Sequence, residues 1–317
     1  MQFGFNLPIS GPVLSPAHIT RLAQEGEAMG FDFLTLTDHV LLPDMSAPGY
    51  PYTESGEFMS SAPTQRHEQL AAASFIAAKT SRIRIVLAVL VVPHRPAVVA
   101  AKTLATIDYL SGGRLTVGIG AGWLEAESNA VVLTPFKERG AVTDEYVQAF
   151  RQLWTEHKPL IDGKYVKVDG TMLMEPKPVQ QPIPIWVGGE SGPSLRRAAR
   201  LGDAWYPIGS NRNALYDTLP RFAAGIARLR RLTAEAGRPE NAVLVAYRVK
   251  RYGPAIGTVA TDGQPRLFSG DDRAIIADLR ALRDLGVSAV DFDFEMDDID
   301  ASLTEMRRFR ADVLTKV

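Results

Sequence analysis

The chain has 317 residues, 46% of them hydrophobic, which is long for one ordinary domain but usual for barrels and large α/β folds. Its 35 basic and 36 acidic residues give a formal net charge of −1, and no long run of one sign occurs, which argues against nucleic-acid binding or a polybasic membrane role. There is no cysteine, so disulfides, thiol catalysis and thiolate metal sites are excluded.

The expected location is the cytoplasm, and a chain without cysteine suits a reducing compartment. The first residues, "MQFGFNLPIS", lack a basic region followed by an apolar stretch, so no secretory signal is expected. The longest apolar run, Ile83 to Pro93, is too short to span a bilayer.

Short apolar strands alternate along the chain with longer helical patterns. In chain order, strands are predicted over Gln2–Leu7, Phe33–Thr37, Ile83–Val91, Arg114–Ile119, Ile183–Val187, Ala204–Ile208, Val243–Val249 and Ala289–Phe294. The first helix is predicted to begin at Pro16, with Ser15 as its N-cap, and to stop at Gly30. Further helices are predicted over Glu68–Thr80, Ala97–Leu110, Asp144–Glu156, Ser194–Leu201, Leu215–Ala236, Asp271–Leu285 and Ile299–Leu314.

Alternation of strands and helices is typical of a parallel sheet, and eight such units favour a single (β/α)8 TIM barrel over residues 1–317. The alternative is a doubly wound open sheet, which more often has fewer strands. Long insertions are predicted after strand 2 (Leu41–Arg66), strand 4 (Trp123–Pro182, with a helix and a hairpin around Asp169-Gly170) and strand 7 (Tyr252–Gly270). All three would lie on the active-site face of a barrel, where long ordered loops often act as lids.

Asp38 and His39 end the second predicted strand, which would place both on the catalytic rim. A histidine can donate or accept a proton near neutral pH, and the neighbouring carboxylate could fix its tautomer or raise its pKa. The alternative is a rim histidine that caps a loop or hydrogen-bonds a carbonyl group.

Two glycine-rich segments follow predicted strands 4 and 5. In "GGRLTVGIGAGW", Gly120 and Gly122 would let the backbone approach a flat ligand, whereas Gly118 fits a layer of small residues inside the barrel. The spacing is not that of the dinucleotide fingerprint. In "IPIWVGGESGPSLRRAAR", the turn from Gly188 to Gly192 leads into a helix whose first N–H groups could bind an anion. A plain strand-to-helix turn with a serine cap is the alternative.

A metal site is not expected. The sequence "HEQLA" fails the zinc pattern H-E-x-x-H, and cysteine ligands are missing. Asp291 and Asp293 alternate on strand 8 and so share one face. Either they point into the barrel or they pair with arginines on neighbouring helices, and pairing is favoured.

Together these segments resemble the bacterial luciferase-like monooxygenase superfamily, and within it the deazaflavin (coenzyme F420)-dependent oxidoreductases. The motifs that carry the resemblance are "DHV", "VLVVPHRPAVVAAKTLATIDYLSGGRLTVGIGAGW", "PFKERGAVTDEYVQAFRQLW", "EPKPVQQPIPIWVGGESGPSLRRAARLGDAWYP" and "LGVSAVDFDF". They extend over essentially the whole chain. The combination is specific for the superfamily and less so for the cofactor.

The resemblance implies a flavin-type ring in the barrel mouth, supported by a non-prolyl cis peptide that would fall at Ala88-Val89. It implies that the phosphate-bearing tail runs toward Gly120 and Gly122 and toward the turn formed by Gly188, Gly189, Glu190, Ser191 and Gly192. It further implies that His39 lies near the reactive ring as acid/base or substrate contact, with Asp38 as its orienting neighbour. Related sugar-phosphate dehydrogenases carry a carboxylate where this chain has Trp123, which favours a flatter or more apolar substrate.

The expected activity is hydride transfer between coenzyme F420 and a small carbonyl, alcohol or activated-alkene substrate. The main alternative is an FMN-dependent two-component monooxygenase of the same fold, which would need a reductase partner to supply electrons. A cofactor-free barrel that only binds a ligand is a third possibility. The resemblance also implies a homodimer that pairs through barrel helices.

Overall fold

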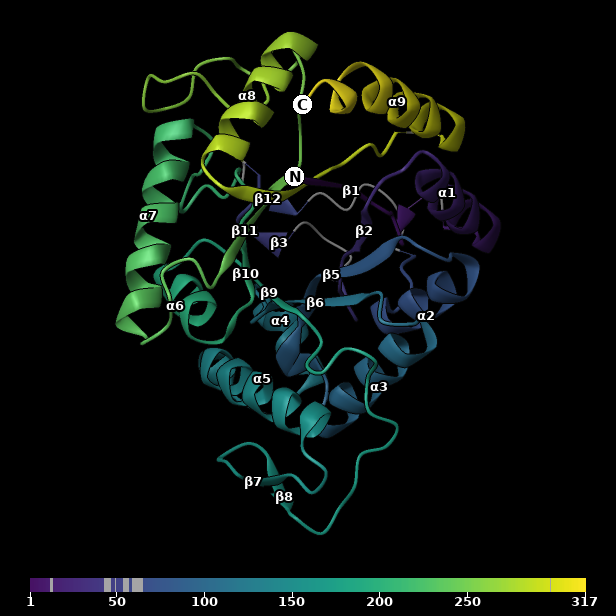
Figure 1. The fold of residues 1–317 in the computed structure, drawn as a ribbon, viewed down its shortest axis with the longest axis vertical. Coiled ribbons are helices and arrows are strands. Elements are labelled where there is room, and N and C mark those ends of the chain that lie inside the picture. The colour runs from purple at the N-terminus through teal and green to yellow at the C-terminus, as the bar shows by residue number, and fades with distance from the viewer. Residues whose placement is uncertain (12–13, 43–46, 49, 54–56, 59–64, 297) are drawn as a thin grey trace.

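The computed structural model describes residues 1–11, 14–42, 47–48, 50–53, 57–58, 65–296 and 298–317. Eight parallel strands close into a barrel surrounded by helices, which confirms the predicted (β/α)8 fold (Figure 1). In the order in which they are hydrogen-bonded, the strands are β1 (Gln2–Asn6), β12 (Val287–Phe292), β11 (Leu244–Val249), β10 (Ala204–Tyr206), β9 (Ile185–Gly188), β6 (Leu115–Gly120), β5 (Arg84–Val91) and β2 (Phe33–Leu36), and β2 returns to β1.

Each barrel strand coincides with one of the predicted strands, because strands buried on both faces read as short continuous apolar runs. Inside the barrel, the rings of Phe33 and Trp186 meet edge to face with centroids 5.7 Å apart. Alanines of the later strands fill the remaining space in this layer, namely Ala204, Ala246 and Ala289. This apolar layer closes the centre of the barrel, so a ligand can enter only from an end.

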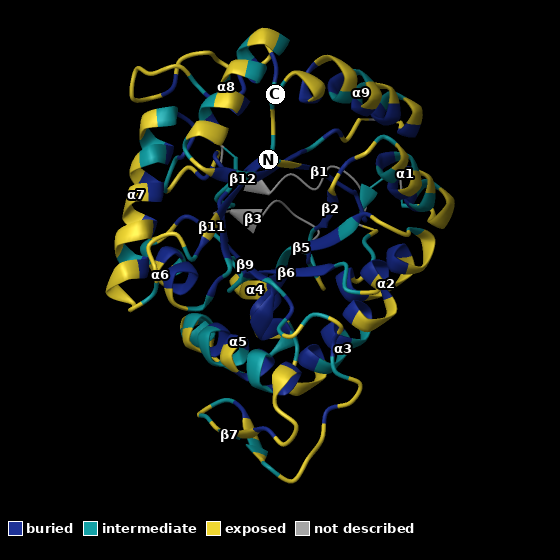
Figure 2. Ribbon diagram, viewed as in Figure 1, coloured by how far each residue is buried: buried dark blue, intermediate teal, exposed yellow. Residues whose placement is uncertain are grey.

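The outer ring consists of helices whose apolar faces cover the strands. They are α1 (Pro16–Ala28), α2 (Gln69–Lys79), α3 (Ala97–Leu110), α5 (Arg139–Thr155), α6 (Gly192–Leu201), α7 (Leu219–Glu235), α8 (Asp272–Asp284) and α9 (Ile299–Asp312). Figure 2 shows the strands buried and the outward faces of the helices exposed. Ser15 caps α1 as predicted, since its side chain accepts a hydrogen bond from the backbone N–H of His18.

Some predicted boundaries are wrong. Helix α5 begins at Arg139 rather than Asp144, and α7 begins at Leu219 because Thr218 caps it with its side chain. A hairpin follows α5, but β7 (Leu160–Asp162) pairs with β8 (Lys167–Asp169), so its turn lies between these strands and not at Asp169-Gly170.

The three predicted insertions follow β2, β6 and β11, at the C-terminal end of the barrel. Of the first, Leu41–Arg66, residues 43–46, 49, 54–56 and 59–64 lie outside the described part, while β3 (Ala47–Pro48) pairs with β4 (Glu57–Phe58). The second adds a short helix, α4 (Glu125–Val131), directly after β6. Among the described residues, no helix is both long enough and apolar enough to cross a membrane.

Candidate active site

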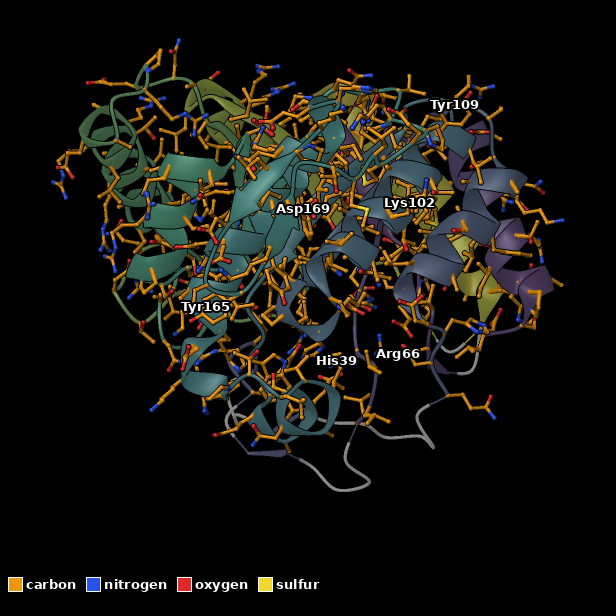
Figure 3. All side chains as sticks on the ribbon, turned by 90° about the horizontal axis from the view of Figure 1, so that it is seen from below. His39, Arg66, Lys102, Tyr109, Tyr165 and Asp169 are labelled. Carbon is orange, nitrogen blue, oxygen red and sulfur yellow. The ribbon has the colours of Figure 1, made fainter. Side chains whose placement is uncertain are left out.

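A cavity of about 460 Å³ opens at the C-terminal end of the barrel. Its walls come from the last residues of β2, β5, β6, β9, β10 and β11 and from the segments directly after them. Figure 3 places His39 and Arg66 together at one end of the molecule, opposite the end at which Tyr109 of α3 lies. Of the predicted site residues, the cavity is lined by Asp38, His39, Ala88, Val89, Gly120, Gly122, Gly188, Gly189 and Ser191.

His39 is held by Glu127, which the sequence analysis missed. The Nδ1 atom of His39 lies 2.8 Å from Oε2 of Glu127, and Oε1 accepts hydrogen bonds from the backbone N–H groups of Val40 (2.6 Å) and Leu41 (3.1 Å). Burial alone would raise the pKa of Glu127, but these hydrogen bonds and the nearby imidazole hold that pKa below its ordinary value. Glu127 is therefore an ionised acceptor that fixes both the ring and the start of the loop.

The prediction that Asp38 orients His39 is wrong. One carboxylate oxygen of Asp38 accepts hydrogen bonds from the backbone N–H of Val91 (2.9 Å) and from Arg95 (2.7 Å), and the other accepts from Arg95 at 2.9 Å. Asp38 is buried and its carboxylate is turned toward β5 and the residues after it. It ties the end of β2 to the end of β5, and the orienting role belongs to Glu127.

A bulge with a cis peptide bond between Ala88 and Val89 interrupts β5, where the resemblance placed it. The neighbouring glycines make room for this bulge. A Cβ atom on Gly118 would lie 2.0 Å from the carbonyl oxygen of Leu87, and Cβ atoms on Gly120 and Gly188 would lie 2.6 and 2.7 Å from the side chain of Val89. Gly120 and Gly188 therefore shape the cavity wall through Val89 and also line the cavity, whereas Gly118 leaves room for the backbone of Leu87.

The turn after β9 leads into α6 as predicted, but only part of it borders the cavity. Gly189 (φ +98°) and Ser191 line the cavity, and the Ser191 side chain caps α6 by accepting from the N–H of Ser194 at 3.3 Å. Glu190 and Gly192 lie outside the described lining of the cavity, and their role as direct cofactor contacts stays a prediction.

Glu190 instead lies behind the wall, 2% exposed. Its carboxylate accepts hydrogen bonds from the backbone N–H of Ile208 (2.6 Å) and from the side chain of Asn211. The side chain of Tyr52, which lines the cavity, also hydrogen-bonds this carboxylate. Burial raises the pKa of Glu190 from 4.5 to about 7, because desolvation of the charged form outweighs these donors.

Glu190 makes the protein less stable as the pH rises. The folded state binds its proton more tightly than the unfolded state does, so between about pH 5 and pH 8 the free energy of unfolding is expected to fall by up to about 3 kcal/mol through this group. Guanidinium unfolding of the wild type and of Glu190→Gln over this pH range measures this fall in the free energy of unfolding. Glu125→Gln, a change at an exposed glutamate, is the control. A difference between wild type and Glu190→Gln that does not change with pH would contradict the assignment.

The floor of the cavity is a buried polar network. Arg248 donates to Asn6 (2.9 Å) and Thr35 (3.2 Å) and lies 3.5 Å from Asp291, which also accepts a 2.6 Å hydrogen bond from Tyr206. Asp291 thus both points inward and pairs with an arginine, but the arginine belongs to β11 rather than to a helix as predicted. Arg248 and Tyr206 border the cavity, so this hydrogen-bond network connects the cavity wall to the barrel core.

Basic side chains dominate the charged lining of the cavity. Lys137, Arg139 and Arg197 approach it from the segment around the start of α5 and from α6, next to the turn after β9. Arg197 pairs with Asp144, and Arg139 donates to the carbonyl oxygen of Gly122 at 3.1 Å. An excess of cations beside a helix N-terminus and glycine backbone fits the phosphate group of a flat, phosphorylated cofactor. Among the described residues, no group of His, Asp and Glu side chains could hold a metal ion.

Fold and site together define a barrel enzyme with a cationic cofactor-sized cavity and a histidine–carboxylate pair at its mouth. The chain belongs to the luciferase-like monooxygenase family, whose model matches residues 1–252. The uncharacterized protein Rv0940c of Mycobacterium tuberculosis is 37% identical over 220 residues, which cover 68% of this chain and 72% of that protein.

The chain is also similar to the FMNH2-dependent dimethylsulfone monooxygenase of Pseudomonas fluorescens, with 33% identity over 60% of this chain and 47% of that protein. Two solved structures share the fold. The monooxygenase RslO1 from Streptomyces bottropensis has a TM-score of 0.73 at 21% identity, with 99% of both chains covered. An F420-dependent secondary alcohol dehydrogenase in complex with an F420-acetone adduct has a TM-score of 0.76 at 17% identity, with 100% of this chain and 99% of that chain covered.

Proposed function

We propose that this protein is a deazaflavin (coenzyme F420)-dependent oxidoreductase that acts on a small carbonyl, alcohol or activated-alkene substrate. The observation that carries the proposal is His39, held by Glu127 at the wall of a cavity that is also lined by the Ala88-Val89 bulge and by basic side chains. Hydride transfer needs a positioned group that moves a proton to or from the substrate, and a fixed imidazole meets that need.

Different residues of the cavity would have different roles in this reaction. The bulge at Ala88-Val89 would support the ring, and Lys137, Arg139 and the turn at Gly189 and Ser191 would bind its phosphorylated tail. The cofactor supplies or takes up the hydride when it is bound. His39 handles the proton of the substrate, and Trp123, whose ring centroid is 6.2 Å from that of His39, forms an apolar wall that excludes water.

An FMN-dependent two-component monooxygenase with a separate flavin reductase is the second candidate. The similarity to the FMNH2-dependent dimethylsulfone monooxygenase supports it. The deazaflavin proposal is preferred because a fixed base beside the ring suits proton-coupled hydride transfer. A homodimer and a cytoplasmic location, both expected from the sequence, stay predictions.

Equilibrium binding of oxidised coenzyme F420 and of FMN to the purified protein tests the cofactor. Deazaflavin is expected to bind more tightly than FMN, and Lys137→Met is expected to weaken that binding whereas Lys158→Met, a change outside the cavity lining, is not. Tight binding of FMN with none of deazaflavin would establish the monooxygenase alternative. Failure of a folded protein to bind either cofactor would favour the cofactor-free barrel.

A further inference from the structure

The contacts of Glu127 restrict what His39 can do. Both carboxylate oxygens of Glu127 act as acceptors, and its lowered pKa keeps it ionised near neutral pH. The proton on the neutral imidazole therefore lies on Nδ1, and Nε2 carries a lone pair. In this state His39 is a base, and it can give a proton only after it has gained one. While His39 is in this state, a reaction that adds hydride to a carbonyl carbon needs another proton donor.

Tyr50 lies in the same cavity as His39. Its ring centroid is 5.1 Å from that of Trp123, and both residues line the cavity. The Nζ atom of Lys250, directly after β11, lies 2.7 Å from the hydroxyl oxygen of Tyr50. An ammonium group can only donate, so the tyrosine oxygen is the acceptor. A cation in this position stabilises negative charge on that oxygen.

The backbone next to Tyr50 is also fixed. The N–H of Arg212, in the segment after β10, donates to the carbonyl oxygen of Pro51 at 2.9 Å. Lys250 holds the side chain from β11 at the same time, and the ring of Tyr52 packs edge to face against that of Tyr50 with centroids 5.5 Å apart. Tyr50 is therefore positioned at the cavity by contacts from the segments that follow the neighbouring strands β10 and β11.

We propose that Tyr50 is a second catalytic residue of this site, which binds the substrate oxygen through its hydroxyl group and exchanges a proton with it while Lys250 stabilises the phenolate. This inference rests on the proposed function. In carbonyl reduction, the carbon gains a hydride from the reduced deazaflavin and the electrons of the C=O double bond move to oxygen. The O–H bond of Tyr50 breaks, its proton joins the substrate oxygen, and the phenolate later regains a proton from solvent. Alcohol oxidation runs through the same steps in reverse.

Other charged groups face these two residues. Arg66 and Tyr52 interact electrostatically with Tyr50 in addition to Lys250. His94 interacts electrostatically with both His39 and Glu127. Burial lowers the pKa of His94, so it adds little positive charge beside His39 near neutral pH. Among the contacts of the described residues, the ammonium group of Lys250 is a cation within hydrogen-bond distance of Tyr50.

The kinetics of carbonyl reduction test this role. Tyr50→Phe is expected to lose about 10- to 100-fold in kcat, with unchanged affinity for the deazaflavin. Lys250→Met is expected to behave similarly, and Lys250→Arg to restore most of the activity because it keeps the cation. Tyr109→Phe, at the exposed end of α3, is the control. Wild-type activity of Tyr50→Phe at every pH would overturn the proposal.

Binding of cyclohexenone to the cofactor-free protein gives a second readout, followed by tryptophan fluorescence, to which Trp123 at the cavity wall contributes. Loss of the Tyr50 hydroxyl is expected to weaken binding about 5- to 20-fold, the effect of one hydrogen bond. If the wild type binds no deazaflavin or reduces no carbonyl compound, the proposed function fails before any variant is compared. The enone measurement then decides on Tyr50 alone, and equal affinity of wild type and Tyr50→Phe would refute its contact with the substrate oxygen.

Discussion

A His39→Ala variant is expected to lose about 10²- to 10⁴-fold in turnover, the usual contribution of a positioned acid or base, while its affinity for the cofactor barely changes. The reason is that His39 lies beside Trp123, whereas the cations proposed to bind the cofactor phosphate lie around the start of α5 and on α6. Steady-state kinetics with a parallel binding titration measures both quantities. His157→Ala, a change at an exposed histidine, is the matched control.

Glu127→Gln tests the role of His39 more specifically, because it preserves the shape of the side chain at position 127 and removes its charge. The amide oxygen of the glutamine can still accept from the N–H groups of Val40 and Leu41. The NH2 group of the glutamine would then face Nδ1 of His39. The imidazole must place its proton on Nε2, so the base is lost, and turnover is expected to fall nearly as far as in His39→Ala. Normal turnover with weakened cofactor binding in His39→Ala would remove His39 from the chemistry.

The fold could be predicted from sequence because its signals are local. Parallel strands buried on both faces give short apolar runs, and their alternation with amphipathic helices leaves few topologies. The predicted start of α7 is wrong because the Thr218 side chain caps the helix four residues later than expected. The start of α5 has no capping side chain to mark it, and the hairpin turn depends on the pairing of β7 with β8. The catalytic rim followed from the strand count, so His39 was found with no knowledge of its contacts.

The partners inside the site could not be predicted because they join residues far apart in sequence. Glu127 lies 88 positions from His39 in the sequence. The adjacent Asp38 is the more obvious partner for His39, but its carboxylate is hydrogen-bonded to Arg95 and to the backbone of Val91. The one sequence signal for Glu127 is its place two residues after Glu125, which is exposed, in a helix that follows β6.

The small size of Gly188 was attributed to a ligand and that of Gly118 to a layer of small residues inside the barrel. In the structure both glycines leave room for the Ala88-Val89 bulge of β5. That requirement depends on the register of β5 with β6 and on Val89 reaching across to β9, neither of which a single sequence displays. In the same way, the sequence placed Asp291 beside an arginine without revealing that Arg248 shares the barrel interior with it.

Replacing Arg248 with Met is expected to lower the free energy of unfolding by about 3–5 kcal/mol, the usual cost of leaving one charge of a buried pair alone. The Asp291 side chain is fully buried, and without the guanidinium its remaining partners are the hydroxyl groups of Tyr206 and Thr35. Two hydroxyl donors do not replace a positive charge in a desolvated site.

The pH dependence of this loss identifies its cause. Burial already raises the pKa of Asp291 despite the nearby Arg248, and removal of the cation raises it further. A carboxyl group with a raised pKa in the folded state destabilises the protein as the pH rises, so Arg248→Met should cost more at pH 8 than at pH 5. Guanidinium unfolding of Arg248→Met, Asp291→Asn and the double variant at both pH values measures this coupling. If the double variant is less stable than Arg248→Met at pH 8, the buried charge of Asp291 is not the source of the cost.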